Sequence, residues 1–286
     1  MTEPMDSGAN YRQRVLPYYQ RWESRWGYAI LLGRTRHFGW YEPGGSPWAF
    51  GAAMRRMEAV AARELAVPAA SAVLDAGCGV GDVARTVARE TGALVTGIDG
   101  IEADIGLARR RSARLGQARG GTRFLVADYH ALPFATGSFD GLYTMESFVH
   151  SAEPETALSE FHRVLRPGSR LVMFEYSSTP PHQLTPEANR ALRRVCELSA
   201  MPAMLTLHHG RLERLLTDAG FVVEATLDAT AHVLPMLRAF AVLGALPYGV
   251  AERFGYGDSL VNAMSGVEMY RHQEAWRYSI HTARRP

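Results

Sequence analysis

The residues of this sequence best suited to chemistry follow a short apolar run that begins at Val73. There, Val-Leu-Asp-Ala-Gly-Cys-Gly-Val-Gly places Asp75 before three alternate glycines, Gly77, Gly79 and Gly81. Glycines at a strand-to-helix turn allow positive φ and let the backbone approach a ligand closely. A dinucleotide-binding turn instead uses the spacing G-x-G-x-x-G and seats a pyrophosphate on the helix. An acidic residue before the turn would repel phosphate, so this turn suits a ligand with an ammonium group, such as methionine.

Two further acids lie where an adenosine would need them. Asp99 follows the next expected strand, about 20 residues after the glycine turn, where a carboxylate can accept both ribose hydroxyls. Asp128 ends the third expected strand and could accept from the adenine amino group. A lone Asp at a strand end is at least as often a helix cap. Together with the glycine turn, however, the two acids predict an adenosine site.

Three side chains are candidates for proton transfer near such a ligand. Glu146 and His150 are four residues apart after the fourth expected strand, at the sheet edge where ligands bind in folds of this kind. Glu146 could instead hold the ligand or a backbone amide, and His150 could equally be a packed structural histidine. Glu175 lies near the end of an apolar strand, where burial of a carboxylate costs free energy and needs a reason.

Regular alternation of strands and helices must position these residues. The expected strands cover residues 72–75, 94–98, 122–127, 141–145, 170–176, 221–226 and 275–283. The expected helices cover residues 49–65, 82–91, 102–115, 154–165, 186–198 and 210–219, and an apolar segment at 233–256 also ends in a helix. Elements that alternate at these lengths predict an α/β fold with a doubly wound, mostly parallel sheet. We expect an N-terminal helical lid at 1–48 and a ligand-binding domain at 49–286, with cap segments at about 178–215 and 233–265.

Composition excludes several other classes of protein. The 286 residues carry a net charge of +2, and the arginines are spread along the chain, which argues against nucleic acid as a partner. The sequence has no lysine, which excludes Schiff-base chemistry on that residue. Cys78, Cys196 and the pair His208-His209 lack the spacing of a metal site, so no metal is expected. We expect a cytoplasmic protein without a membrane span or secretory signal, and the sequence leaves homo-oligomerisation open.

Residues 72–176 resemble class I S-adenosylmethionine-dependent methyltransferases, which have a Rossmann-like fold. The flanks are similar to the sterol C-methyltransferase and tocopherol methyltransferase group. Five motifs carry the likeness: WESRWG at 22–27, HFGWYEPG at 37–44, MESFVH at 145–150, EFHRVLRPG at 160–168 and FEY at 174–176. In this chain Gly100-Ile101 replaces the more usual small polar residue after Asp99, which affects only the expected packing of adenine.

The resemblance implies that S-adenosylmethionine binds through the residues already singled out by their spacing. These are Asp75, Gly77, Gly79, Gly81, Asp99 and Asp128. The resemblance also implies that Tyr18 or Tyr19, from the lid, closes over the methionine end of the cofactor.

The resemblance further implies an enzyme of secondary metabolism that acts on a small lipophilic molecule. We expect C-methylation of a prenyl or terpenoid alkene, with cyclisation of the resulting carbocation as one possible outcome. Such chemistry needs a dry aromatic pocket and a base, for which Glu175, Glu146 and His150 are the candidates. The expected pocket side chains are Trp22, Trp26, Trp40, Tyr41, Trp48, Tyr176 and Met204. Ordinary core and lid packing would account for at least half of these aromatic residues.

Two alternative functions remain open from the sequence. One is aromatic C-, O- or N-methylation of a lipophilic natural product, for which proximity and a deprotonating histidine suffice. The other is a protein that binds S-adenosylmethionine without turnover. If the acceptor were a prenyl diphosphate, Arg34, Arg36 and His37 could hold its phosphates, although such residues more often form a solvated face.

Overall fold

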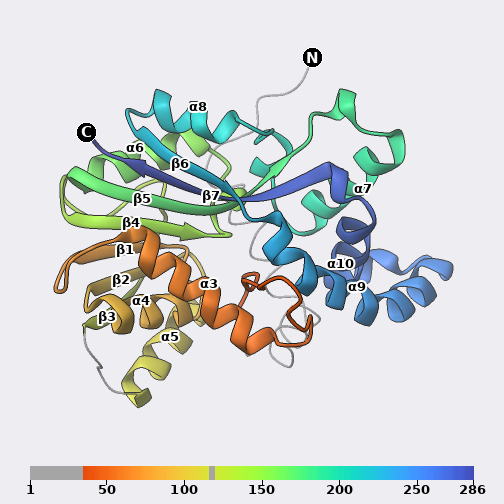
Figure 1. Cartoon of the computed structure of the whole chain (residues 1–286), viewed down its shortest axis with the longest axis horizontal. Coiled ribbons are helices and arrows are strands. Elements are labelled where there is room, and N and C mark those ends of the chain that lie inside the picture. The colour runs from red at the N-terminus through yellow and green to blue at the C-terminus, as the bar shows by residue number, and fades with distance from the viewer. Residues whose placement is uncertain (1–34, 116–119) are drawn as a thin grey trace.

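A seven-stranded sheet forms the centre of the computed structural model, which describes residues 35–115 and 120–286 (Figure 1). The strand order is β3-β2-β1-β4-β5-β7-β6. Strands β1 to β5 run parallel, and β7 is antiparallel to both β5 and β6. The strands are β1 (Ala72–Ala76), β2 (Leu94–Asp99), β3 (Gly121–Val126), β4 (Phe139–Met145), β5 (Leu165–Ser178), β6 (Val222–Asp228) and β7 (Trp276–Arg284). The predicted doubly wound, Rossmann-like α/β class is confirmed.

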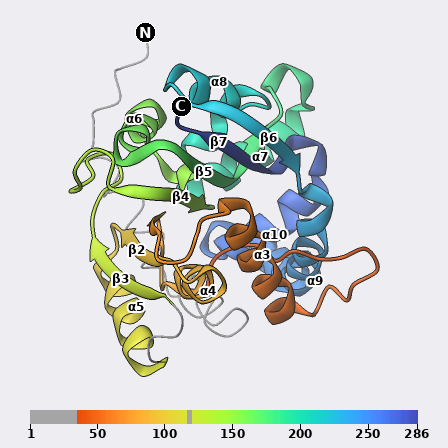
Figure 2. The same cartoon turned by 60° about the vertical axis from the view of Figure 1, so that its left-hand side comes forward.

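Helices cover both faces of this sheet, as Figure 2 shows. Helices α3 (Phe50–Leu65), α4 (Asp82–Thr91) and α5 (Glu102–Leu115) supply buried side chains to one core cluster. Helices α6 (Pro154–Val164) and α8 (Arg211–Asp218) supply the cluster on the opposite face. Because both faces are buried, the central strands are nearly continuous apolar runs. This is why they could be located from the sequence.

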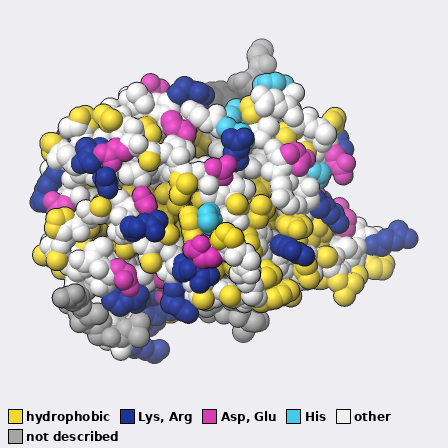
Figure 3. Space-filling view, in the orientation of Figure 1, with side chains coloured by type: hydrophobic (Ala, Val, Ile, Leu, Met, Phe, Trp, Pro, Cys, Tyr) yellow, Lys and Arg dark blue, Asp and Glu magenta, His cyan; other side chains and the backbone are white. Residues whose placement is uncertain are grey.

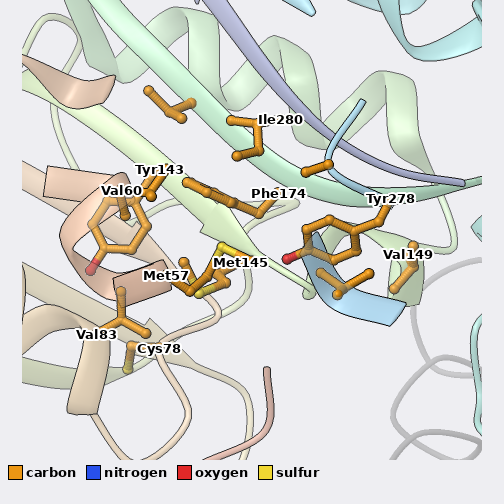
Figure 4. Close-up of a cluster of buried hydrophobic side chains, with 14 of the residues drawn as sticks. Met57, Val60, Cys78, Val83, Tyr143, Met145, Val149, Phe174, Tyr278 and Ile280 are labelled. Carbon is orange, nitrogen blue, oxygen red and sulfur yellow. The ribbon is translucent and has the colours of Figure 1, made fainter. Parts of the chain in front are cut away.

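The larger core cluster fixes the central strands against α3. Tyr143 of β4 and Phe174 of β5 lie over Met57 and Val60 of α3 (Figure 4). None of these four side chains is more than 4% exposed. This packing holds β4 and β5 in place against α3. The candidate catalytic residues lie near the carboxyl ends of these two strands.

Strand β5 is longer than the strand predicted at 170–176. It begins at Leu165, which pairs with Phe139, and it continues to Ser178. The extension at its carboxyl end arises because β7 pairs with it antiparallel along its whole second half, up to Ser178↔Trp276. A pairing partner about 100 residues away leaves no signal in the local sequence pattern.

Three cap helices lie beyond the carboxyl ends of the parallel strands (Figure 1). They are α7 (Pro186–Leu198), α9 (Thr230–Arg253) and α10 (Val261–Arg271), and α10 contacts both of the others. Within the described ranges, α9 is the one helix long and apolar enough to cross a membrane, and 39% of its most apolar window is buried in this cap. Its outer face carries several of the hydrophobic side chains that gather at the lower right of Figure 3. The exposed large hydrophobic residues of α9 are Val242, Leu243, Leu246 and Val250, and the exposed Phe254 directly follows the helix.

Candidate active site

The glycine turn between β1 and α4 has the backbone that its sequence predicts. The angle φ is +96° at Gly77, +50° at Gly79 and +77° at Gly81. A Cβ on Gly77 would lie 2.3 Å from the Cβ of Ser147, and a Cβ on Gly81 would lie 2.6 Å from the ring of Phe124. A Cβ on Gly79 would meet nothing within 4 Å. The outer glycines are therefore required by packing, whereas Gly79 leaves open space beside the turn.

This open space belongs to a pocket at the carboxyl ends of the central strands. The pocket brings most of the predicted site residues together from four separate segments of the chain. Those that line it are Asp75, Gly77, Gly79, Asp99, Asp128, Glu146 and His150. Gly81 is not among them, because it packs behind the turn against Phe124. Three residues not predicted as cofactor ligands, Thr35 to His37, also line the pocket.

Two carboxyl groups face the pocket, that of the buried Asp75 from β1 and that of the half-buried Asp99 from β2. Asp75 accepts a hydrogen bond of 2.7 Å from the Tyr143 hydroxyl, and burial raises its pKa to about 7. Asp99 accepts from the backbone N–H of Gly79 at 2.9 Å and of Ile101 at 2.8 Å. Burial also raises the pKa of Asp99, to about 6. A cationic ligand would favour the ionised form of Asp75, and ribose hydroxyls could donate to Asp99.

Asp128, the third acid, holds the loop after β3. Its Oδ1 accepts from the backbone N–H of His130 at 2.9 Å and lies 2.7 Å from His130 Nδ1. On the other side of the ring, His130 Nε2 lies 2.8 Å from the hydroxyl oxygen of Ser151. This Asp–His–Ser series matches a hydrolytic triad in connectivity, but Ser151 is only 1% exposed and cannot reach a substrate. We interpret these contacts as structural, because they order the loop that carries Asp128 at the edge of the pocket.

Glu146 occupies an unusual backbone position directly after β4. Its φ is +53°, in the left-handed region that few non-glycine residues adopt. Its Oε1 accepts from the backbone N–H of Phe38 at 2.6 Å and from the Tyr278 hydroxyl at 2.9 Å, and its Oε2 accepts from the Tyr176 hydroxyl. Burial raises the pKa of Glu146, although these hydrogen bonds oppose the shift. The carboxyl group thus lies between the pocket and three aromatic residues.

His150 lines the same pocket as a neutral ring. Its Nδ1 lies 2.6 Å from the carbonyl oxygen of Ala200, to which it donates, and burial lowers its pKa to about 4. The tie to Ala200 joins the turn after β4 to the cap. Both the structural and the proton-accepting interpretations of His150 are compatible with this geometry.

The prediction that Glu175 serves as a base in the pocket needs correction. Glu175 is fully buried and is not among the residues that line the pocket. Its oxygens accept from the hydroxyl of Thr144 at 2.9 Å and from the backbone N–H groups of Phe148 at 2.9 Å and Val149 at 3.3 Å. Burial raises its pKa to about 8. The carboxyl group anchors the turn that carries His150, which explains why a buried strand contains it.

Comparison with known proteins identifies the family. A methyltransferase domain model matches residues 74–173. The S-adenosyl-L-methionine-dependent Diels-Alderase iccD of Talaromyces variabilis is 34% identical over 280 residues, which cover 96% of each chain. This chain belongs to the S-adenosylmethionine-dependent methyltransferase family.

Other members of the methyltransferase family extend this likeness. Sterol 24-C-methyltransferase erg-4 of Neurospora crassa is 30% identical over 77% of this chain and 57% of its own length. The crystal structure of the [4+2]-cyclase SpnF superimposes with a TM-score of 0.70 at 24% identity, over 97% of this chain and 95% of the other. The resemblance stated from the sequence motifs is therefore confirmed at the level of family and fold.

S-adenosylmethionine, the cofactor of this methyltransferase, suits the pocket on the geometry described above. Gly79 leaves space beside the turn, and Asp75 is a buried carboxyl group that no described cation contacts directly. Asp75 would therefore hold the ammonium group. Asp99 would hold the ribose and Asp128 the adenine.

Among the aromatic residues predicted to form a substrate pocket, Tyr176 belongs to an aromatic cluster, but Trp40 and Tyr41 do not. Tyr176 contacts Phe38 and Tyr278 edge-to-face, with ring centroids 6.0 and 5.3 Å away. Trp40 instead stacks on His232 at 3.7 Å, and Tyr41 is buried.

Several other members of the predicted pocket are placed elsewhere or are not described. Trp48 is 52% exposed and Met204 is fully buried in the core cluster on the α3 face of the sheet. Trp40, Tyr41, Trp48, Met204 and Tyr176 do not line the cofactor pocket, and their assignment to a substrate pocket stays a prediction. The remaining predicted residues, Tyr18, Tyr19, Trp22 and Trp26, lie outside the described residues, as does Arg34.

Sequence reasoning missed Phe38 and Tyr278 as partners of Glu146, and it considered His37 only as a phosphate ligand. Phe38 and Tyr278 both hold Glu146, and His37 lines the pocket. Position 278 gave no signal because it lies on the antiparallel strand β7. Arg36 and His37 were considered for a diphosphate, but Arg36 pairs with Asp104 at 2.9 Å and His37 is buried.

Proposed function

We propose that this methyltransferase transfers a methyl group to an alkene carbon of a lipophilic prenyl or terpenoid secondary metabolite. The observation that supports the proposal is the position of Glu146, which lines the cofactor pocket and accepts from two tyrosines of an aromatic cluster. The cluster consists of Phe38, Tyr176 and Tyr278. Aromatic rings stabilise a nearby cation, and a carboxylate can remove its proton.

In the proposed reaction the cofactor supplies the methyl group and the protein removes a proton. Bound S-adenosylmethionine supplies an electrophilic methyl group on sulfur. The alkene electron pair forms the new C–C bond as the S–C bond breaks, which leaves a carbocation on the acceptor. Glu146 then takes a proton from a neighbouring carbon, and the C–H electron pair becomes a new double bond. A carboxylate has about four lone-pair sites, and the three hydrogen bonds from Phe38, Tyr176 and Tyr278 leave one for this proton.

The test uses methyl-deuterated S-adenosylmethionine and a panel of lipophilic acceptors. The panel contains prenyl diphosphates, prenylated indoles, sterols and prenylated phenols, and products are located by mass spectrometry and NMR. We expect the label on a former alkene carbon, with or without a new ring formed when an internal nucleophile captures the cation. Label on oxygen, nitrogen or an aromatic carbon would overturn the alkene mechanism.

A second candidate function is a [4+2] cyclisation of a lipophilic polyene in the presence of intact S-adenosylmethionine. The observation that favours it is the likeness to the Diels-Alderase iccD over 96% of both chains. Such a cyclisation joins a diene to an alkene without transferring a group or a proton, so Glu146 would have no proton to accept. The same assay, extended to linear polyenes with a conjugated diene and an electron-poor alkene, separates the two candidates. Cyclisation would give an unlabelled product with the mass of the substrate, without consumption of the cofactor.

A further inference from the structure

A buried ion pair beside the cofactor pocket has no part in the reaction proposed above. His37 and Glu58 of α3 are 5% and 6% exposed, and His37 Nε2 lies 3.6 Å from Glu58 Oε1. Thr86 of α4 donates its hydroxyl to Glu58 Oε2. The other ring nitrogen, His37 Nδ1, donates to the carbonyl oxygen of Phe38 at 2.8 Å. With a carboxylate on one side and a carbonyl on the other, the ring is surrounded by acceptors and suits the doubly protonated form.

The charges around the pair also favour a protonated ring. Burial would lower the pKa of His37, but Glu58, the Phe38 carbonyl and Glu146 together outweigh burial and raise this pKa above its ordinary value of 6.5. The pKa of Glu58 is lowered, because His37 and Thr86 outweigh burial there. The charge of protonated His37 lowers the pKa values of Asp75 on β1 and of Glu146, directly after β4, against the effect of burial.

Other charged groups surround these carboxyls and complete the electrostatic environment. Asp99 on β2 raises the pKa of Asp75, and Arg89 on α4 lowers the pKa of Glu58. In the Arg36–Asp104 pair, Asp104 raises the pKa of Asp99 and Arg36 lowers it.

The same histidine also fixes the backbone that holds Glu146. The Phe38 carbonyl accepts from His37, and the Phe38 N–H donates to Glu146 at 2.6 Å. The Phe38 ring in turn lies 6.0 Å from the rings of both Tyr176 and Tyr278. A continuous series of contacts therefore joins Glu58, His37, the Phe38 peptide and Glu146.

We propose that His37, protonated by virtue of Glu58, is a positioning residue that favours the ionised form of Asp75 for the ammonium group of S-adenosylmethionine and fixes the Phe38 backbone against Glu146. His37 and Asp75 line the same pocket. The inference rests on the assignment of Asp75 to the cofactor made above. It makes the affinity for the cofactor depend on pH through a residue that need not contact the ligand.

The test is isothermal titration with S-adenosylmethionine alone between pH 5.5 and 7.5, below the usual pKa range of an α-amino group at about 7.7–8.0. The variants are His37→Gln, Glu58→Gln, the double variant, and His232→Gln as matched control. The control also removes a ring nitrogen 2.8 Å from a backbone carbonyl of the 35–48 segment, that of Tyr41, but it faces no pocket carboxylate.

We expect the affinity of the unaltered protein to rise with pH as Asp75 loses its proton. His37→Gln should move this rise upward by about one pH unit, the shift expected from loss of one nearby opposite charge, so that the affinity at pH 6.5 is about tenfold lower and is still increasing at pH 7.5. Glu58→Gln should give the same shift, because His37 then loses its proton at lower pH, and the double variant should shift no further than either single variant. The midpoint of His232→Gln should not move.

If His37→Gln lowers the affinity equally at every pH and leaves the midpoint of the rise unchanged, His37 has only a structural role. That result would overturn the proposal. If His37→Gln does not fold, an unchanged midpoint in Glu58→Gln overturns it instead. No acceptor is present in the titration, so failure of the proposed methylation would leave this result unaffected.

Discussion

Glu146 owes its position to a backbone conformation that few side chains tolerate. Its φ of +53° comes directly after β4, and it turns the carboxyl group away from the strand toward Tyr176 and Tyr278. Strained conformations of this kind persist only where the surrounding structure holds them, and they cluster at functional sites. Here three hydrogen bonds do so. The sequence placed Glu146 at the right sheet edge, but it could not show which donors surround it.

Replacement of Glu146 tests its role as proton acceptor. With the alkene substrate found by the labelling assay, Glu146→Gln should lower kcat by about 10²–10⁴-fold, the usual contribution of a general base. Affinity for S-adenosylmethionine should change only a few-fold, because we assign the cofactor contacts to Asp75 and Asp99 rather than to Glu146. Single-turnover kinetics and calorimetric titration measure the two effects separately. Full turnover in this variant would show that a group other than Glu146 accepts the proton.

Replacement of Asp75 tests the cofactor assignment. Asp75→Asn keeps an acceptor for the Tyr143 hydroxyl, which donates at 2.7 Å, but it removes the charge that would pair with an ammonium group. We expect at least a tenfold loss of affinity for S-adenosylmethionine at pH 7.5 and no loss of stability in the cofactor-free protein. Calorimetric titration and thermal unfolding are the measurements. An unchanged affinity would show that the ammonium group binds elsewhere.

At the scale of elements, the alternation of side chains along β5 explains why Glu175 points away from the pocket. Side chains of successive residues on a strand point to opposite faces. Tyr176 reaches Glu146, so Glu175 must point the other way, toward Thr144 and the turn at Phe148. The sequence showed that a carboxylate lay near the end of β5. It could not show that the adjacent residue was the one facing the site.

A structural role for Glu175 predicts a large effect on stability. Glu175→Ala leaves two buried backbone N–H groups and the Thr144 hydroxyl without this acceptor, at a cost of about 1–3 kcal/mol for each unsatisfied group. We expect the free energy of unfolding in urea to fall by about 3 kcal/mol or more. Glu175→Gln keeps one acceptor oxygen and should lose less. A stable Glu175→Ala protein with impaired catalysis would restore Glu175 as a candidate base.

Strand β7 marks the limit of what the sequence predicts at this scale. The parallel strands follow from short buried runs between helices, and their order is typical of a doubly wound sheet. Tyr278 reaches Glu146 only because β7 inserts antiparallel between β5 and β6. That arrangement depends on pairing between residues about 100 positions apart, which local periodicity does not encode.

At the scale of the whole molecule, the cofactor-free protein retains buried carboxyl groups whose protons the unfolded chain would release. Burial raises the pKa of Asp75 to about 7 and of Glu175 to about 8, above their ordinary values of 3.8 and 4.5. Above pH 7 the native state therefore binds more protons than the unfolded state. The free energy of unfolding must then decrease as pH rises. His150, with a pKa lowered to about 4, is neutral in the native state and nearly so in the unfolded state throughout this range.

We therefore expect the Tm of the cofactor-free protein to fall between pH 7 and pH 8.5. A loss of 1 kcal/mol corresponds to about 2–4 °C in a large single domain, so a fall of a few degrees should be measurable by scanning calorimetry. Glu175→Gln should flatten this dependence, because its amide does not titrate. Saturating S-adenosylmethionine should raise Tm more at pH 7.5 than at pH 6, because its ammonium group pairs with ionised Asp75. A Tm that rises with pH in the cofactor-free protein would mean that these carboxyls are already ionised in the native state, and that the pocket supplies a counter-charge of its own.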